Sequence, residues 1–234
     1  MTDPLALPAS RILVVAPHPD DESLGCGGVI AMLRGDGRTV KVVFVTDGGA
    51  SHTGSRHWPR WRLAARRREE ALAALECLGV PARDAHFLDL ADADMPPAGS
   101  PLDLGAVDTL TRLMAGFKPD LVLMPWRRDP HCDHRDAWRL THDALSRTER
   151  QVLTLEYAVW LDEIGAPADH PGKDEAERIV FDITPAVDAK RLAVAAHVSQ
   201  TSDLIHDDPA GFRLKPETID RLCRPFEIYW RPRS

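Results

Sequence analysis

The chain has 234 residues, of which 44% are hydrophobic and 28% are charged, and its formal net charge is −7. This hydrophobic fraction is enough for a substantial core and argues against disorder, and the negative charge disfavours non-specific binding to nucleic acids. No linker, low-complexity tract or internal repeat divides the sequence. We therefore expect a single domain over residues 1–234.

The four cysteines are widely spaced and form no Cys-x-x-Cys pair, which argues against a disulfide framework and against a structural zinc knuckle. The first residues lack the basic and apolar regions of a signal peptide, and no run of about 20 apolar residues occurs. We therefore expect a cytoplasmic protein without a membrane-spanning segment.

Apolar runs alternate with helical patterns along the chain. In chain order, the patterns predict a strand at 11–16, a helix at 23–34, a strand at 40–46, a helix at 61–78, a strand at 85–90, a helix at 104–117, a strand at 121–124, a helix at 135–147, strands at 155–161 and 178–183, a helix at 184–198 and a strand at 226–230. Thr184-Pro185 is expected to cap the last helix, and 226–230 is expected at an edge of the sheet. This order predicts a three-layer, Rossmann-like α/β fold with a mainly parallel sheet.

Polar clusters follow three of the predicted strands, at residues 18–22, 47–57 and 129–134. Ligands of parallel α/β sheets bind beyond the carboxyl ends of the strands, so we expect an active site there. The glycines in residues 25–28 are not interpreted as a dinucleotide-binding loop, because three carboxylates precede them and would repel a phosphate. Close packing of a helix on the sheet explains these glycines better.

The segment His18-Pro19-Asp20-Asp21-Glu22 ends the first apolar run with one imidazole and three carboxylates. Carboxylates this close repel one another, so such a cluster usually either stays in water or holds a cation. His18 supplies a nitrogen ligand and Asp21 an oxygen ligand for a zinc-like ion, which leaves Asp20 to act on a water. A solvated acidic turn is the alternative interpretation.

The segment His131-Cys132-Asp133-His134 is the second candidate for metal chemistry. Two histidines at i and i+3 point to roughly the same side of a helix start, with Asp133 available to orient one of them. His18, Asp21 and His134 would form a set of two histidines and one carboxylate, which leaves a position open for water. Zinc is the default ion for this set, and other divalent transition metals also suit it. A helix N-terminus with surface histidines is the alternative.

The segments His18-Pro19-Asp20-Asp21-Glu22 and His131-x-Asp133-His134 together resemble the LmbE/PIG-L family of zinc-dependent N-deacetylases. The resemblance covers most of residues 11–200. Further matches to the family occur at Thr46-Asp47-Gly48, Arg67-x-x-Glu70, Phe87-Leu88, Asp92, and Lys190 with Ala196-His197-x-Ser199-Gln200. The chain departs from the family pattern at Gly49, where glutamate is frequent, and at Cys132, where proline is common.

The resemblance implies that His18, Asp21 and His134 bind the metal and that Asp20 is the general base. Asp20 would take a proton from the water that attacks the amide carbonyl and return it to the leaving amine. The metal would lower the pKa of the water towards about 7 and polarise the carbonyl.

The resemblance also assigns residues to the transition state and to the substrate. It implies that His131, held by Asp133, stabilises the oxyanion of the tetrahedral intermediate when the imidazole is protonated. Arg67 and Asp92 match positions that contact sugar hydroxyls. His197 matches a position near the site, although it is equally consistent with a hydrogen-bonded core residue.

These features predict a hydrolase that removes an N-acetyl group from a small molecule containing N-acetylglucosamine (GlcNAc). One alternative is a hydrolase of another amide, such as an acylated antibiotic or an aminoglycoside precursor. A second is a non-catalytic α/β protein that binds a sugar or nucleotide, which is disfavoured because pure binding does not require Asp20. The expected partner is an N-acetylated sugar and not a nucleic acid, and the sequence leaves a homo-oligomer open.

Overall fold

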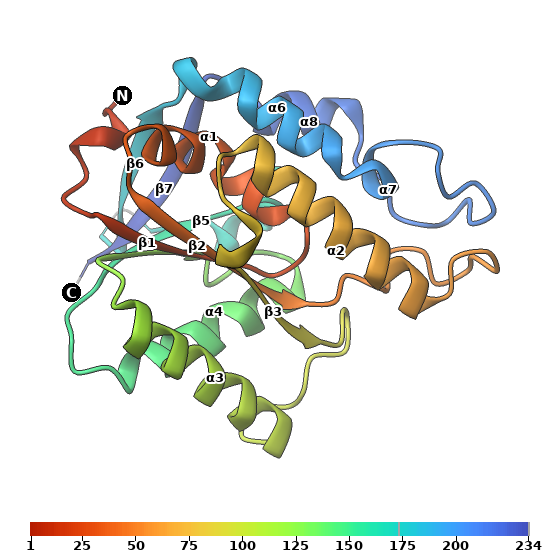
Figure 1. Ribbon diagram of the computed structural model, residues 1–234, viewed down its shortest axis with the longest axis horizontal. Coiled ribbons are helices and arrows are strands. Elements are labelled where there is room, and N and C mark those ends of the chain that lie inside the picture. The colour runs from red at the N-terminus through yellow and green to blue at the C-terminus, as the bar shows by residue number, and fades with distance from the viewer. Residues whose placement is uncertain (173, 234) are drawn as a thin grey trace.

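The structure is a computed structural model that describes residues 1–172 and 174–233 (Figure 1). Its strands are β1 (Arg11–Ala16), β2 (Thr39–Thr46), β3 (Ala85–Leu90), β4 (Leu121–Pro125), β5 (Leu153–Tyr157), β6 (Ala176–Asp182) and β7 (Phe226–Pro232). Its α-helices are α1 (Asp21–Gly35), α2 (Arg60–Cys77), α3 (Pro101–Phe117), α4 (Cys132–Ser146), α5 (Leu161–Ile164), α6 (Val187–Ala196), α7 (Val198–Thr201) and α8 (Pro216–Leu222).

The strands form one sheet in the order β3-β2-β1-β4-β5-β7-β6. The five strands from β3 to β5 are parallel, and β7 runs antiparallel to both of its neighbours. This arrangement confirms the predicted α/β class with a mainly parallel sheet. None of the helices in the described ranges has the length and hydropathy needed to cross a membrane.

Helices cover both faces of the sheet, with α1, α2 and α6 on one face and α3 and α4 on the other (Figure 1). Strand β1 lies at the centre of the sheet. Its Ile12 and Val14 pack in the core beneath α1, while Leu13 and Val15 pack in the core against α3 and α4. Burial on both faces explains why this strand is a continuous apolar run in the sequence.

Helix α1 packs closely against the sheet through its glycines. A Cβ atom at Gly25 would lie 2.2 Å from the ring of Tyr157, and one at Gly28 would lie 2.3 Å from Ile183. Any larger side chain would push the helix away from the strands. This contact supports the interpretation of these glycines as packing residues.

The prediction of an edge strand at 226–230 is wrong. Strand β7 lies between β5 and β6, and the whole of β6 pairs with it. The inner face of β7 carries a buried carboxylate, that of Glu227, which accepts hydrogen bonds from the backbone nitrogens of Gly28 and Val29 in α1. These contacts across two layers were not apparent from the local pattern.

Two other boundaries differ from the predictions. Strand β5 ends at Tyr157 and does not extend to Leu161, because the backbone nitrogens of the next residues turn towards a carboxylate after β4. Thr184 does not cap α6: it starts a 3₁₀ turn, and its hydroxyl donates to Asp182. The long predicted helix is divided at His197, where ψ is 61° and the chain leaves α6 before it enters α7.

Candidate active site

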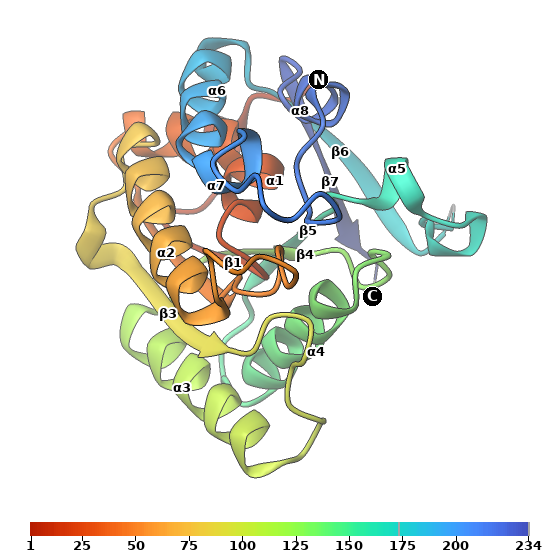
Figure 2. The same ribbon diagram turned by 90° about the vertical axis from the view of Figure 1, so that its right-hand side faces the viewer.

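A cavity of about 790 Å³ lies beyond the carboxyl ends of the parallel strands. These strand ends face the viewer in Figure 2. We call its inner part the floor, which comprises the buried residues His18, Asp20, Asp21, Arg67 and Asp92 and the partly exposed His131. We call its opposite part the outer wall, which comprises Trp160, Glu163, Ile164, Phe212, Arg213, Leu214, Lys215 and Thr218. Segments that follow β1 to β4 supply most of the floor, and loops near α5, α7 and α8 supply the outer wall.

The three predicted metal ligands come together at the floor, where His18 and Asp21 line the cavity and His134 does not. Asp21 Oδ2 lies 3.0 Å from His18 Nδ1 and 3.2 Å from His134 Nε2. All three side chains are buried, and that of His134 is 0% exposed. His18 and Asp21 are positioned by the turn between β1 and α1, and His134 by the first turn of α4.

The donor set fits a divalent metal ion. Among the described residues His134 Nε2 has no hydrogen-bond partner, although it faces a carboxylate oxygen 3.2 Å away. In a tetrahedral zinc site, two ligand atoms that each lie about 2.1 Å from the metal are about 3.4 Å apart. The distances from Asp21 Oδ2 to the ring nitrogens of His18 and His134 are close to this value. Imidazole and carboxylate ligands also suit other transition metals. Ring nitrogens of His18, His131 and His134 also lie within 4.8 Å of one another.

Asp129 supports His134 from the side opposite Asp21. Its Oδ1 lies 3.2 Å from His134 Nδ1 and is completely buried. Its Oδ2 accepts hydrogen bonds from the backbone nitrogens of Val159 and Trp160. A carboxylate behind a metal-binding histidine fixes the ring and its tautomer. Asp129 begins the predicted polar cluster at 129–134, but no role was predicted for it.

The carboxylates stabilise positive charge in this cluster. Burial alone would lower the pKa of His134, but Asp21 and Asp129 raise it to about 9. Burial likewise opposes the positive charge of His18, yet hydrogen bonds to Asp133, Asp21 and then Asp92 raise its pKa well above the ordinary value. A site built in this way favours a cation.

The expected contact between the Asp133 carboxylate and His131 is not present. Asp133 Oδ2 instead lies 3.0 Å from His18 Nε2 and accepts a hydrogen bond from the backbone of Ala93. The backbone nitrogen of Asp133 donates to His131 Nδ1 at 3.2 Å, so His131 is the N-cap of α4. The carboxylate points back to the β1 side of the site because the helix start directs it there. Burial lowers the pKa of His131 to about 4, and the charges of His18 and His134 act in the same direction.

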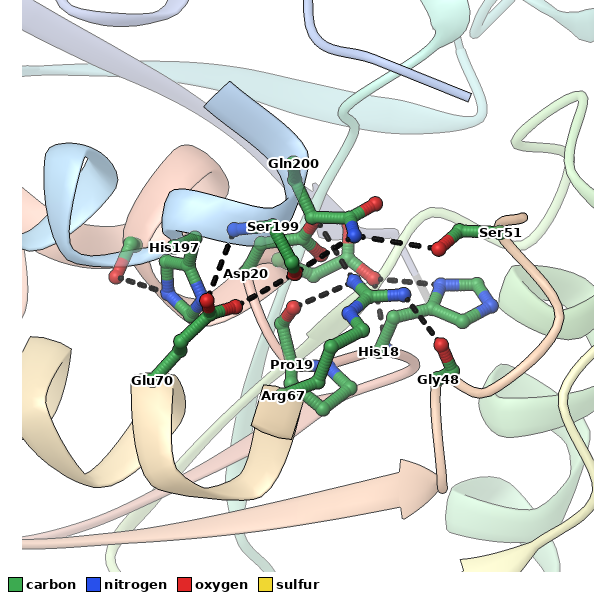
Figure 3. Close-up of polar contacts among 12 residues, drawn as sticks. His18, Pro19, Asp20, Gly48, Ser51, Arg67, Glu70, His197, Ser199 and Gln200 are labelled. Atoms are coloured by element: carbon green, nitrogen blue, oxygen red, sulfur yellow. Dashed lines mark hydrogen bonds and ion pairs between the residues drawn. The ribbon is translucent and has the colours of Figure 1, made fainter. Parts of the chain in front are cut away.

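Arg67 contacts the predicted general base and two backbone carbonyls. Its guanidinium lies 2.9 Å from Asp20 Oδ2 and donates to the carbonyl oxygens of Pro19 and Gly48 (Figure 3). Burial raises the pKa of Asp20 to about 6, against the opposing charge of Arg67. Arg67 also lines the cavity, so its predicted contact with sugar hydroxyls stays a prediction.

The backbone of Asp20 is strained. Its φ is 142°, a value that side-chain-bearing residues rarely adopt. Glu22 holds this conformation, because its Oε2 accepts the hydrogen bond of the Asp20 backbone nitrogen at 3.0 Å. The other oxygen of Glu22 accepts from Ser23 Oγ and lies 3.0 Å from His197 Nε2. His197 is 0% exposed and does not line the cavity, so its contact is with Glu22 and not with the space for a ligand.

A second buried network lies beside Arg67. Both oxygens of Glu70 accept hydrogen bonds from Ser199, through its backbone nitrogen and its hydroxyl (Figure 3). Gln200 Nε2 donates to Ser199 Oγ and to Ser51 Oγ, which joins α7 to the loop after β2. The family-like blocks around Arg67 and His197 therefore meet in space. Their match to the family did not predict these contacts.

Asp92 lies on the floor as expected. Its Oδ1 is 3.3 Å from His18 Nε2, and its Oδ2 accepts a hydrogen bond from the backbone nitrogen of Ala50 at 2.7 Å. Burial would raise its pKa, but the contact with His18 holds it below the ordinary value, so the carboxylate is ionised. Asp92 thus offers an acceptor to the cavity.

The polar loop after β2 is tied to the loop after α7. Asp207 accepts hydrogen bonds from Ser55 Oγ and from the backbone nitrogens of Arg56 and His57. The backbone nitrogen of Phe212 donates to the carbonyl of Ser51 at 2.7 Å. The two loops form one continuous border of the cavity, which could not be foreseen from segments about 150 residues apart in the sequence.

This fold and site define an α/β protein with a histidine–aspartate centre suited to a metal and with a buried carboxylate beside it. The sequence model of the PIG-L family, described as GlcNAc-PI de-N-acetylase, matches residues 13–145. Since this match covers more than half of the chain, the protein belongs to that family.

Two curated relatives are deacetylases. Diacetylchitobiose deacetylase of Thermococcus kodakarensis is 34% identical over 145 residues, which cover 58% of this chain and 49% of that enzyme. This alignment therefore spans about half the length of the relative. The 1D-myo-inositol 2-acetamido-2-deoxy-alpha-D-glucopyranoside deacetylase of Mycobacterium sp. (strain KMS) is 28% identical over 232 residues, with 82% of this chain and 74% of that enzyme covered.

Solved structures share the fold. The N,N′-diacetylchitobiose deacetylase of Pyrococcus horikoshii, in complex with its inhibitor MPG, is 25% identical with a TM-score of 0.64, over 84% of this chain and 72% of that one. GalB of Pseudomonas putida KT2440, a 4-carboxy-2-hydroxymuconate hydratase, is 22% identical with a TM-score of 0.69, over 96% and 98%. The second likeness concerns the fold alone, and it shows that this fold also occurs in an enzyme with a different reaction.

Proposed function

We propose that the protein is a metal-dependent deacetylase that hydrolyses the acetamide of a GlcNAc-containing small molecule to acetate and a free amine. The observation that supports this most is the placement of Asp20, a buried carboxylate on the cavity floor directly beside the His18, Asp21 and His134 cluster. A site that only bound a sugar would not require a buried base held in a strained backbone conformation.

His18, Asp21 and His134 would hold the metal, with zinc as the expected ion. When bound, the metal acts as a Lewis acid that polarises the acetamide carbonyl and makes a water acidic enough to react near neutral pH. Asp129 fixes the His134 ring, and the surrounding carboxylates favour a cation at this point.

Asp20 is assigned as the general base. With a pKa of about 6, its carboxylate is largely ionised at neutral pH and still basic enough to accept a proton from the attacking water. The water oxygen bonds to the carbonyl carbon, and the C–N bond then breaks as Asp20 returns the proton to the amine nitrogen. Arg67 aims the carboxylate, and Glu22 holds its backbone, with His197 behind Glu22. We therefore assign His197 to positioning and not to substrate contact.

His131 is assigned to the oxyanion of the tetrahedral intermediate. Because its Nδ1 accepts the hydrogen bond of the Asp133 backbone nitrogen, a neutral ring carries its proton on Nε2. The ring lines the cavity, so this N–H can donate to the developing negative charge without prior protonation of the imidazole. Asp133 acts through His18 and the start of α4, and Asp92 is assigned to a sugar hydroxyl.

The test is the release of free amine from GlcNAc, N-acetylated disaccharides and non-sugar amides by protein loaded with zinc, with acetate measured in parallel. Equal amounts of amine and acetate from the sugar amides are expected. Turnover confined to non-sugar amides would favour the alternative hydrolase, and binding of sugars without any acetate would favour a binding protein. We also propose that the protein is a single domain and is located in the cytoplasm.

A further inference from the structure

The cavity is larger than one N-acetylated sugar ring requires. Its volume of about 790 Å³ lies in the range of pockets that enclose drug-sized ligands. The floor accounts for the acetamide and the sugar hydroxyls under the proposed function. The outer wall is therefore left to contact a further part of the substrate.

The outer wall is apolar at its centre. Ile164 is 65% exposed and Phe212 is 38% exposed, and both line this cavity. Trp160 meets Phe212 edge to face, with ring centroids 5.6 Å apart. Leu214 lies beside them and is buried. Exposed apolar groups gathered at one place mark a contact surface.

Except for Lys215, the charged groups of the outer wall have partners within the protein. Glu163 pairs with Arg221 at 3.0 Å and accepts a hydrogen bond from Thr218. Arg213 pairs with Asp203.

Asp208, which also lines the cavity, accepts a hydrogen bond from the backbone nitrogen of Gly54. Among the described residues Lys215 alone on this wall has no ion pair, and a single lysine on a flexible stem does not make a phosphate site.

We propose that the outer wall binds an apolar aglycone, an aryl or alkyl group joined to the N-acetylated sugar whose acetamide lies at the floor. This inference rests on the proposed function. The acetamide carbon must reach groups that are at most 7% exposed, so the opposite end of the sugar extends towards the mouth of the cavity. Trp160, Ile164 and Phe212 then cover the aglycone and exclude water from it.

The experiment compares kcat/KM of the zinc-loaded full chain for four substrates: GlcNAc, 4-nitrophenyl N-acetylglucosaminide, N,N′-diacetylchitobiose and GlcNAc 1-phosphate. Amine release is measured for each. Burial of an aryl group predicts a preference of about tenfold or more for the nitrophenyl glycoside over GlcNAc. Phe212→Ala and Trp160→Ala should each reduce this ratio several-fold. Trp61→Ala, which removes a tryptophan that is 74% exposed elsewhere on the surface, should leave the ratio unchanged.

The outcomes separate this inference from the proposed function. If no substrate releases an amine, the proposed function fails. If amines are released but the disaccharide or the 1-phosphate is processed as efficiently as the aryl glycoside, the apolar aglycone is wrong while the deacetylase stands. An aryl preference that survives both substitutions would also overturn the role of the outer wall. Phe212 is exposed, so its variant tests the wall even if Trp160→Ala unfolds the chain.

Discussion

The floor and the outer wall of the same cavity are built on different physical principles. The floor consists mainly of buried ionisable groups, and many of their polar atoms are held by other protein groups. The outer wall consists of loop residues and short helices, with exposed apolar side chains between surface ion pairs. Buried polar networks fix one geometry, whereas a loop surface tolerates substitution. The comparison suggests that the reaction is determined at the floor and the choice of substrate at the wall.

The largest effect is expected from His134→Ala, which removes the buried imidazole of a proposed metal ligand. Without it the proposed ligand set falls to two, so the protein should lose its metal and its activity. His142→Ala, on the exposed side of the same helix, is the matched control. Metal content measured by mass spectrometry after gel filtration distinguishes them, and a full metal complement in His134→Ala would refute the ligand assignment.

Asp20→Asn should lower kcat by about 10²- to 10⁴-fold, as expected for the loss of a general base. The amide keeps the shape of the side chain but accepts no proton, and Asp20 is not among the proposed ligands, so metal content should not change. Asp20 directly precedes α1, and Asp36 directly follows it at an exposed position, so Asp36→Asn serves as the control. Wild-type turnover by Asp20→Asn would assign the base elsewhere.

Asp129→Asn should weaken metal affinity by about 10- to 100-fold, less than the loss of a ligand. The variant keeps hydrogen bonding to the backbone of Trp160 but removes the charge beside His134 Nδ1. Competition with a zinc chelator measures the effect. Asp143→Asn, on the surface of α4, should match wild type, and equal affinity in Asp129→Asn would show that this carboxylate supports only the wall.

The smallest effect is expected from Glu175→Gln, which acts on the ion pair that ties the segment after α5 to Arg128. The hydrogen bond from Arg128 lowers the pKa of Glu175 to about 2, below its ordinary value of 4.5. Its stabilising contribution is therefore present above pH 4.5 and lost as the pH falls towards 2. At neutral pH the variant should be less stable by up to about 1 kcal/mol, because the pair is partly exposed. Urea unfolding at pH 7 and pH 3 measures this difference, and a larger difference at the lower pH would contradict the sign.

The sequence carried more information about the floor than about the wall. His18, Asp20 and Asp21 follow an apolar run directly, and parallel strands place their carboxyl ends at one edge, so the convergence with His134 could be predicted. The fold class followed from the same alternation. The partner of each side chain could not be predicted in this way, because a carboxylate such as Asp133 can turn to either side of a helix start. It contacts His18 instead of His131.

The positions of Arg67 and His197 illustrate the same limit. Family-like spacing placed both near the site, but burial decides what they contact, and burial depends on the packing of α6 against α1 and α2. The contacts of the outer wall could not be predicted from the sequence for another reason. Trp160 and Phe212 lie about 50 residues apart in segments without periodicity, and their contact depends on hydrogen bonds formed by Asp129 and by the loop after β2.

The strained backbone of Asp20 should lower the stability of the protein at the residue on which the proposed activity depends. At most positions glycine destabilises a protein relative to alanine, but at a φ of 142° the order should be reversed, since only glycine adopts this angle without strain. Asp20→Gly and Asp20→Ala lose the same carboxylate, so the difference in their unfolding free energies isolates the backbone strain, which should favour glycine by about 1 kcal/mol or more. Equal stability, or a more stable alanine variant, would show that the position is relaxed. Selection for stability alone would thus tend to replace the very residue on which turnover depends.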